Sequence, residues 1–233
     1  MTKAEKIANF NPSGVGQKNG HFAGLPFTEE DASIVLLPVP WDVTASYNDG
    51  TSTGPQNILE CSAQLDLHDP DVFEAWKIGI YMRHLDLFWL NRNQELRPEA
   101  ETYIDFLENG GDINSDPIKK EILSKINDAC GQLKKWVFEE SLKIINSGKK
   151  VGIIGGEHSV PLGYLEALAS KYRSFGVLQI DAHQNLKKAY EGFIYSHASL
   201  FNNALSIDYI SQLIRSWCAR FFRRKIYFFR NKP

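Results

Sequence analysis

The chain has 233 residues, of which 43% are hydrophobic and 23% charged, a balance that suits one globular α/β domain or two small ones. A net charge of −2 gives the whole molecule no electrostatic attraction to nucleic acid or to an anionic membrane, so we expect neither as a partner. The three cysteines are far apart and no apolar run is long enough for a membrane span. We therefore expect a protein of the reducing cytoplasm, without disulfides or thiolate zinc sites.

The first half of the chain shows short strand and helix signals separated by loops. Residues 1–30 are polar and rich in glycine, which indicates a loosely packed lead-in. Apolar, β-branched runs indicate buried strands, and a proline after a glycine-rich loop indicates the first turn of a helix. We expect strands at 33–39 and 77–81 and a helix at about 55–65. Residues 83–116 are mixed and polar, with a loop at 109–112.

The second half alternates helix and strand signals. Pro117 to Asn146 carries apolar residues three or four positions apart, and Gly148 follows as the expected left-handed cap of that helix. We expect further strands at 151–154 and 175–180, and further helices at 159–171 and 196–205. Strand, helix and strand at these spacings predict an α/β fold with a parallel sheet.

Two of the predicted strands end in residue types that bind metals. The first leads into Gly155-Gly-Glu-His158 and the second into Asp181-Ala-His183. Ligands bind beyond the carboxyl ends of parallel strands, so His158, Asp181 and His183 converge if the two strands are neighbours. In extended backbone, Asp181 and His183 share a direction. Imidazole nitrogen and carboxylate oxygen suit a divalent ion such as Mn²⁺, Fe²⁺, Ni²⁺ or Zn²⁺.

The same residues also have structural interpretations. A histidine after a strand is often hydrogen-bonded loop structure rather than a ligand, so His158 by itself leaves both open. A charged pair such as Asp181 and His183 at a buried strand end needs compensation, which favours a metal more strongly. Gly155 and Gly156 serve either a tight turn or the close approach of backbone to a bound group.

The motifs GGEHS, DAHQN and YSHAS, in this order and at these separations, resemble those of the ureohydrolase family of arginases, agmatinases and formiminoglutamases. Upstream, the stretch VPWDVTASYNDGTSTGPQNILE is most similar to the agmatinase branch. The resemblance covers roughly residues 33–214 in four separate motifs. It implies an arginase-like, three-layer α/β/α fold with a mostly parallel sheet, and a centre of two manganese ions.

The resemblance also implies roles by position. His158 matches a terminal ligand of one metal, Asp181 a ligand at the bridged centre, and His183 a ligand of the other metal. His197, in YSHAS, matches a histidine near the substrate for proton transfer, although without the family it is equally an ordinary helix N-terminal residue. The implied reaction is attack of a metal-bound hydroxide on a guanidino carbon, which releases urea and an amine.

The chain departs from the family pattern. Position 185 is asparagine where the motif Asp-Ala-His-x-Asp has a bridging aspartate, so the centre loses one negative charge. Glu157, in place of an aspartate that is no ligand, is a milder change. A later Asp-x-Asp pair has no counterpart, because no aspartate follows Asp208 and no glutamate follows Glu191. We expect one manganese ion or weak occupancy, and a sheet that is incomplete at the C-terminus and exposes an unpaired edge.

Residues 215–233 form an atypical basic tail. Subtracting its seven Lys and Arg from 26 leaves 19 basic residues against 28 acidic ones in the first 214, a balance of about −9. One interpretation is a basic-aromatic segment for nucleic acid or a membrane surface, but its amphipathic pattern is poor. The other is a reading-frame shift near Arg215. One set of codons for 216–221, read one base later, encodes Val-Gly-Val-Arg-Asp-Phe, which resembles the family's next strand.

Together these observations predict a polar lead-in at 1–30, a partial ureohydrolase α/β domain at 31–214, and the tail at 215–233. The predicted function is agmatinase- or arginase-like hydrolysis of a small linear guanidino compound to urea and an amine, impaired in this chain. The alternative is a non-catalytic metal-binding or interaction protein that keeps the fold. Members of the family are typically oligomeric, so the resemblance implies a homo-oligomer.

Overall fold

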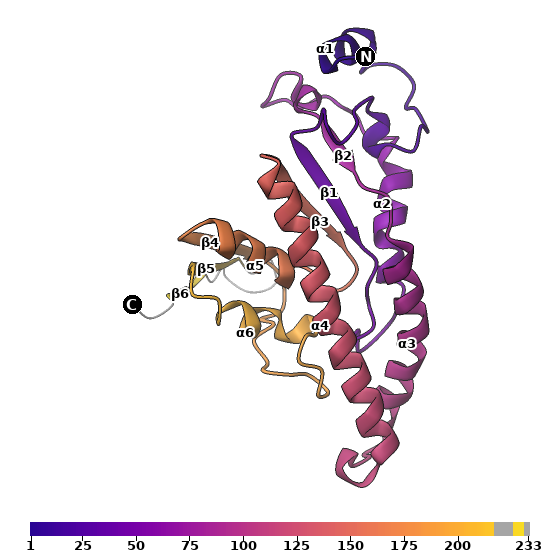
Figure 1. Ribbon diagram of the computed structural model, residues 1–233, viewed down its shortest axis with the longest axis vertical. Helices are drawn as coiled ribbons and strands as arrows, with labels where there is room; N and C mark the ends of the chain where they lie inside the picture. Colours follow the sequence, from indigo (N-terminus) through magenta and orange to yellow (C-terminus); the bar gives the residue numbers. More distant parts are fainter. Residues whose placement is uncertain (217–225, 231–233) are drawn as a thin grey trace.

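The computed structural model describes residues 1–216 and 226–230, with side chains as far as residue 216. Its strands form two three-stranded sheets (Figure 1). The first sheet is parallel and has the order β2 (Ile80–Met82), β1 (Ile34–Val39) and β3 (Lys150–Gly155). The second has the order β4 (Phe175–Ile180), β5 (Ile210–Ser216) and β6 (Ile226–Arg230), with β4 parallel and β6 antiparallel to β5.

The helices of the described residues are α1 (Lys3–Asn9), α2 (Gly54–Ser62), α3 (Leu87–Glu108), α4 (Pro117–Asn146), α5 (Leu162–Lys171) and α6 (Leu200–Ala204). Most predicted elements are confirmed, and α4 and β4 have the predicted bounds. The predicted strand 77–81 begins later, because a 3₁₀ turn occupies Ala75–Ile78. Helices α3 and α4 meet at a turn that projects beyond the sheets and gives the molecule its elongated shape (Figure 1).

The ends of α4 follow directly from its sequence. Asp116 accepts hydrogen bonds from the backbone N–H groups of Ile118 and Lys119, both at 3.0 Å, and so caps the N-terminus. Pro117 occupies the first turn, where its missing N–H breaks no helical bond. Gly148 ends the helix with a φ of 79°, a left-handed conformation that glycine adopts without strain, as predicted.

The sequence assigned no helix to 83–116, but α3 fills 22 of these residues, and the expected loop at 109–112 follows it. A proline at position 98 and many polar side chains obscure the helical pattern in the sequence. A proline inside a helix costs roughly 3 kcal/mol, and burial of residues such as Trp89, Leu96 and Ile104 offsets this cost. These side chains pack in the main core with β1 and α4. Tertiary packing therefore stabilises α3 although its local sequence disfavours a helix.

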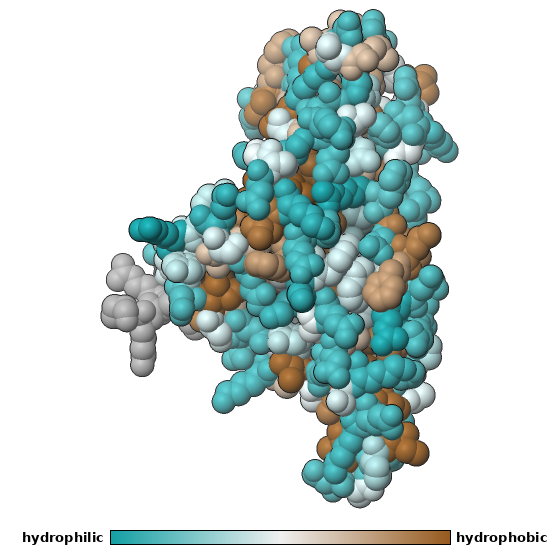
Figure 2. Space-filling model, viewed as in Figure 1, coloured by the Kyte–Doolittle hydropathy of each residue, from teal (hydrophilic) through white to brown (hydrophobic). Residues whose placement is uncertain are grey.

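Each of the two sheets packs against its own hydrophobic cluster. The main core joins β1, α3 and α4, with Val35, Val39 and Val137 all fully buried. A second cluster joins α5, α6 and β5 and includes Phe201 and Leu213. Figure 2 shows hydrophilic colours over much of the visible face, as expected for helices that turn a charged side to solvent.

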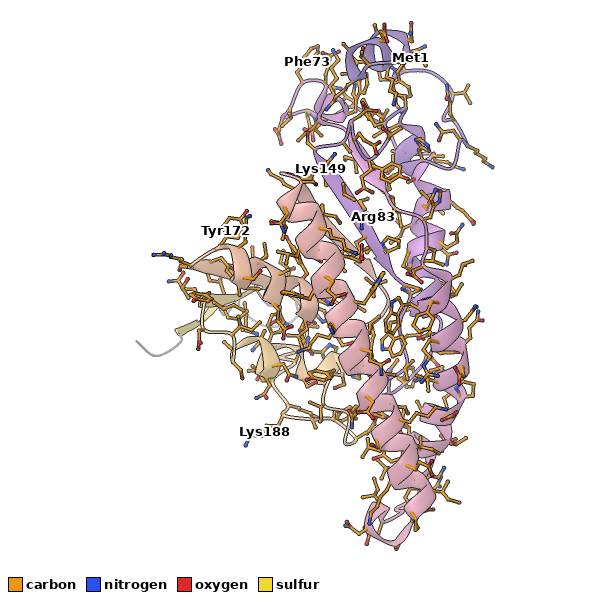
Figure 3. All side chains as sticks on the ribbon, in the orientation of Figure 1. Met1, Phe73, Arg83, Lys149, Tyr172 and Lys188 are labelled. Carbon is orange, nitrogen blue, oxygen red and sulfur yellow. The ribbon has the colours of Figure 1, made fainter. Side chains whose placement is uncertain are left out.

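Ion pairs connect α4 to the elements around it. Arg83, directly after β2 and labelled in Figure 3, contacts Glu29 at 2.6 Å and Glu140 of α4 at 2.8 Å. Lys125 of α4 contacts Glu99 of α3 at 2.6 Å. The Lys125–Glu99 pair is about one-third exposed, so it adds roughly 0–1 kcal/mol and sets the helix register more than the stability.

The stretch 1–30, expected to be a loosely packed lead-in, is partly buried. Ala23, Leu25 and Phe27 form a third hydrophobic cluster with Trp76. Asp31 ties α1 to this cluster, because Lys6 Nζ lies 2.5 Å from its Oδ2, and the N–H and hydroxyl of Thr28 donate to the same oxygen at 3.1 and 2.9 Å. The Lys6 ammonium is the main reason that the pKa of Asp31 falls from 3.8 to about 2.

Replacing Asp31 with asparagine is expected to lower the free energy of unfolding by about 1–2 kcal/mol, since a charged hydrogen-bond acceptor is lost. A carboxylate with a lowered pKa adds stability that is fully present above pH 3.8 and disappears as the pH falls through about 2. Urea denaturation between pH 2 and 7 measures this, with Asp128→Asn on the exposed side of α4 as the control. Equal acid sensitivity of Asp31→Asn and wild type would contradict the expectation.

The fold class is α/β with mostly parallel strands, as predicted, but the strands form two sheets rather than one. Within the described residues, β3 pairs only with β1 and β4 only with β5, so the predicted strands 151–154 and 175–180 are not neighbours. The side chains of Leu178 and Ile180 on β4 are 62% and 73% exposed. Strands of a parallel sheet are normally covered on both faces, so this face of β4, itself an edge strand of the second sheet, is uncovered.

The tail proposed from the sequence overlaps a strand that no pattern predicted. β5 ends at Ser216, so Arg215 belongs to the second sheet rather than to a separate tail. Residues 217–225 and 231–233, where the frame-shift interpretation falls, lie outside the described residues. No helix in the described part of the chain combines the length and apolar character that a membrane crossing requires.

Candidate active site

The loop after β3 rests on the chain that follows β1. A Cβ at Gly156 would lie 2.0 Å from the backbone oxygen of Trp41, so only glycine fits. The backbone N–H of Glu157 donates to the same oxygen at 2.8 Å. Gly156 therefore lets the turn lie against backbone, and this contact fixes His158 at the carboxyl edge of the first sheet.

Asp181, which follows β4, is the centre of a hydrogen-bonded cluster, with 12% of its side chain exposed. Its Oδ2 accepts from the side-chain amides of Gln179 at 2.9 Å and Asn185 at 2.6 Å. Its Oδ1 accepts from the backbone N–H of His183 at 2.8 Å. His158 Nδ1 lies 3.1 Å from Asp181 Oδ2, so the ends of β3 and β4 meet here although the strands do not pair.

The surroundings of Asp181 keep it ionised. Burial alone would raise the pKa of this carboxyl group, but hydrogen bonds from the His183 N–H and from the Gln179 amide, together with His158 and the Asn185 amide, hold it below its ordinary value. N–H donors of the protein therefore occupy both oxygens of a charged carboxylate.

Asn185 closes the cluster. Its φ of 54° lies in the left-handed region, which asparagine tolerates better than most residues, and it is only 8% exposed. Its backbone oxygen accepts from the N–H of Phe201 at 2.9 Å, which anchors it to α6. Its Nδ2 lies 2.6 Å from Asp181 Oδ2 and 2.9 Å from His158 Nδ1, so one amide group bridges the two predicted ligands.

His183 is less confined than the other two predicted ligands. It was expected to share a direction with Asp181, but β4 ends at Ile180 and the chain leaves the extended conformation. Its side chain is 85% exposed, and its Nδ1 lies 3.6 Å from Asp181 Oδ1, beyond hydrogen-bond distance. The structure therefore brings His158 and Asp181 together and leaves the imidazole of His183 in solvent.

His197 begins the short turn that leads into α6 and lies beside Glu157. Its Nδ1 is 3.6 Å from Glu157 Oε2, and neither atom has a hydrogen-bond partner among the described residues. Glu157 Oε1 accepts from the hydroxyls of Thr44 at 2.5 Å and Ser159 at 2.7 Å, which leaves Oε2 beside the imidazole. The Glu157 carboxylate raises the pKa of His197 above its ordinary value, against the opposing effect of burial.

Replacing Glu157 with glutamine is expected to lower the pKa of His197, because the ion pair loses its negative partner. A histidine with a raised pKa adds stability that is present below its unfolded pKa, about 6.5, and is lost as the pH rises through the folded pKa. As the pH rises from about 6.5 through the folded pKa of His197, the variant should therefore lose less stability than wild type. NMR titration of the His197 imidazole measures the shift, and Ser159→Ala, which keeps the carboxylate, is the control. An unchanged pKa in Glu157→Gln would show that no ion pair forms in solution.

Sequence reasoning missed two members of the cluster, Gln179 and Arg215. Arg215 is 6% exposed, and its Nε donates to Gln179 Oε1 at 2.8 Å while its Nη2 donates to the backbone oxygen of His183 at 3.0 Å. It was counted with the basic tail. The signal in the sequence was its place next to the apolar residues of β5, which indicates burial. A buried arginine requires hydrogen-bond acceptors, here Gln179 Oε1 and the backbone oxygen of His183.

Cavities do not by themselves mark the site. A cavity of about 280 Å³ adjoins the loop after β3 and is lined by Gly156, Glu157 and His158, among others. A larger cavity, about 650 Å³, lies between residues 10–17 and 63–76. It holds none of the predicted site residues, so the chemistry of the strand ends is the better guide.

The described donors do not fit a centre of two manganese ions. Within the part of the chain that the structure describes, no three His, Cys, Asp or Glu side chains gather closely enough to hold a metal ion. Asp181 is the one carboxylate of the hydrogen-bonded cluster, and N–H groups occupy its oxygens. Two dications require several anionic oxygens, and the amide of Asn185 brings no charge.

Comparison with known proteins places the chain in a family. The model of the Arginase family matches residues 32–221. The N(1)-aminopropylagmatine ureohydrolase of Synechocystis sp. is 27% identical over 180 residues, which cover 76% of this chain and 48% of the relative. The agmatinase of Bacillus anthracis is 28% identical over 170 residues, which cover 73% of this chain and 46% of the relative. The chain thus spans about half the length of the curated relatives it matches.

Solved structures share the fold. The formiminoglutamase of Trypanosoma cruzi, determined with Mn²⁺, has a TM-score of 0.53 at 18% identity, over 83% of this chain and 55% of that protein. At this identity the likeness concerns the fold alone. The family model covers most of the chain, including the ends of β3 and β4 at which the cluster forms, and by this match the chain is a member of the arginase family.

Proposed function

We propose that the chain carries part of an agmatinase-like ureohydrolase site, and that hydrolysis of a small linear guanidino compound to urea and an amine is impaired in it. The observation that carries the proposal is the contact of His158 with Asp181 across the ends of β3 and β4, in a member of the arginase family. The names of the relatives point to agmatine and N(1)-aminopropylagmatine as substrates. Both combine a guanidino group with an amine chain.

The proposed roles of the chain's residues are proton transfer and metal binding. His197 holds a proton beside Glu157 and transfers it to the departing amine, which its raised pKa favours at neutral pH. His158, Asp181 and His183 are the proposed metal ligands, with manganese at single or weak occupancy. Asn185 supports the reduced occupancy, because its amide takes the place of a carboxylate and contacts two of the three ligands.

Urea release tests the proposed activity. The purified chain is incubated with agmatine, N(1)-aminopropylagmatine or arginine, with and without Mn²⁺, beside the Bacillus anthracis agmatinase. We expect at least about a hundredfold less urea per chain than from the relative, because the metal-bound hydroxide of the family requires a complete ligand set. Turnover close to that of the relative, with two metals per chain, would contradict the impairment.

The alternative is a non-catalytic protein that keeps the fold for metal binding or interaction. The exposed Leu178 and Ile180 of β4 favour it, since large apolar side chains exposed on an edge strand promote association. Light scattering combined with the urea assay separates the two. A defined oligomer that releases no urea supports interaction, and measurable turnover supports the enzyme.

We also propose that residues 31–214 are part of a larger domain and that the tail is read out of frame. Two sheets that do not join, and a chain of about half the length of its relatives, support the partial domain. The nucleotide sequence across residue 215 and beyond tests the second point. A downstream frame that encodes an Asp-x-Asp pair is expected, and the idea fails if no single-base change opens one.

A further inference from the structure

The amide of Asn185 lies where a cation would neutralise the cluster. Its Nδ2 is 2.6 Å from Asp181 Oδ2 and 2.9 Å from His158 Nδ1, and these two atoms are themselves 3.1 Å apart. With the His158 proton assigned to Nε2, Nδ1 is an acceptor and the amide donates to both atoms. Two lone-pair atoms at that distance repel each other unless a positive group lies against both. The NH₂ group of an amide has two N–H bonds and no net charge, so it serves both acceptors without a metal.

A carboxylate at position 185 would change the charge balance of the cluster around Asp181. The left-handed backbone, the burial of the side chain and the bond to Phe201 fix where this side chain points. An aspartate there would set an oxygen about as close to Asp181 Oδ2 as the present Nδ2, and two buried carboxylates in contact cannot both stay ionised without a cation. The residue at position 185 therefore determines whether the cluster needs a cation: an amide does not require one, and a carboxylate does.

We propose that Asn185 acts as an internal substitute for a cation, so that the cluster of Asp181, Asn185 and His158 closes without metal, and that Asn185→Asp converts it into a cluster that requires a divalent ion. The amide competes with the metal for its ligands and does not serve as a ligand itself. This inference concerns metal binding alone, and it holds or fails whether or not the chain hydrolyses a guanidine.

Mn²⁺ titrations of the full chain test the proposal by thermal unfolding and by metal analysis after gel filtration. Without metal, Asn185→Asp is expected to melt below wild type, because of the added like charge beside Asp181. With Mn²⁺ it should recover and bind the ion about tenfold or more tightly than wild type. Asn202→Asp, which adds the same charge in the neighbouring α6 but outside the cluster, is the matched control and should show neither effect.

Asn185→Ala distinguishes a competing amide from a coordinating one. It removes the bridge without adding charge, so we expect Mn²⁺ to bind it at least as tightly as wild type. Weaker binding than wild type would identify the amide as a ligand and overturn the proposal. Equal Mn²⁺ affinity of wild type and Asn185→Asp would overturn it as well. If Asn185→Asp folds only in the presence of Mn²⁺, that result supports it, and if it folds in neither condition the alanine variant decides.

Discussion

Replacing Trp41 with alanine is expected to lower the free energy of unfolding by about 3–5 kcal/mol, the range for removing a buried aromatic side chain. Trp41 is fully buried in the main core, and its ring packs edge-on against Trp89 of α3 at 5.9 Å between centroids. Its loss opens a cavity among β1, α3 and α4 that these elements cannot fill by small movements. Urea denaturation followed by circular dichroism measures the effect.

Two further variants show whether burial causes this loss. Trp41→Phe keeps most of the ring, and the indole N–H has no acceptor among the described residues, so this variant should lose much less stability. Tyr47→Ala removes an aromatic ring that is 91% exposed and should change little. A Trp41→Ala variant as stable as Tyr47→Ala would refute the placement of Trp41 in the core.

Replacing Gly163 with alanine is expected to cost about 1–3 kcal/mol through overpacking between α5 and α4. A Cβ at this position would lie 2.2 Å from the backbone oxygen of Lys134 and 2.8 Å from the backbone nitrogen of Phe138. Both atoms belong to the backbone of a long helix, so neither moves aside cheaply. Because α5 connects β3 to β4, the displacement should also loosen the contact of His158 with Asp181.

Gly131→Ala is the matched control, since Gly131 also lies inside a helix. A Cβ there would meet only Tyr195 Cε2 at 3.7 Å, an ordinary contact. Alanine favours the helix over glycine, so this variant should gain about 0.5–1 kcal/mol. The same substitution is thus expected to have opposite signs on two helices. Two stabilised variants would show that α5 and α4 are not in close contact in solution.

The elements predicted well are those whose signals are local. α4 was predicted with both ends correct, because Asp116, Pro117 and Gly148 act on their own turn of the helix. β4 was predicted in full from six residues of strand-forming pattern. α3 was missed, because the packing that stabilises it against Pro98 comes from β1 and α4. β5 was not predicted, because Arg215 is charged and was assigned to the basic tail at 215–233.

The candidate site shows the same division. The sequence placed His158 and Asp181 at strand ends, and the structure brings the two side chains into contact although β3 and β4 belong to different sheets. It did not show that the strands leave each other unpaired, that His183 turns to solvent, or that Gln179 and Arg215 join the cluster. These features depend on contacts between residues that lie far apart in the sequence, such as Gln179 and Arg215.

By itself, then, the sequence determined the type of most elements, the residue types at the strand ends, the family that the motifs resemble and the lost charge at position 185. Periodicity, caps and short motifs act over a few residues, so they are legible without a structure. Only the tertiary structure decided that the sheet is split, that Glu157 pairs with His197, and that the Asn185 amide bridges Asp181 and His158. Distances of this kind depend on how helices pack between the strands, and no local pattern carries that information.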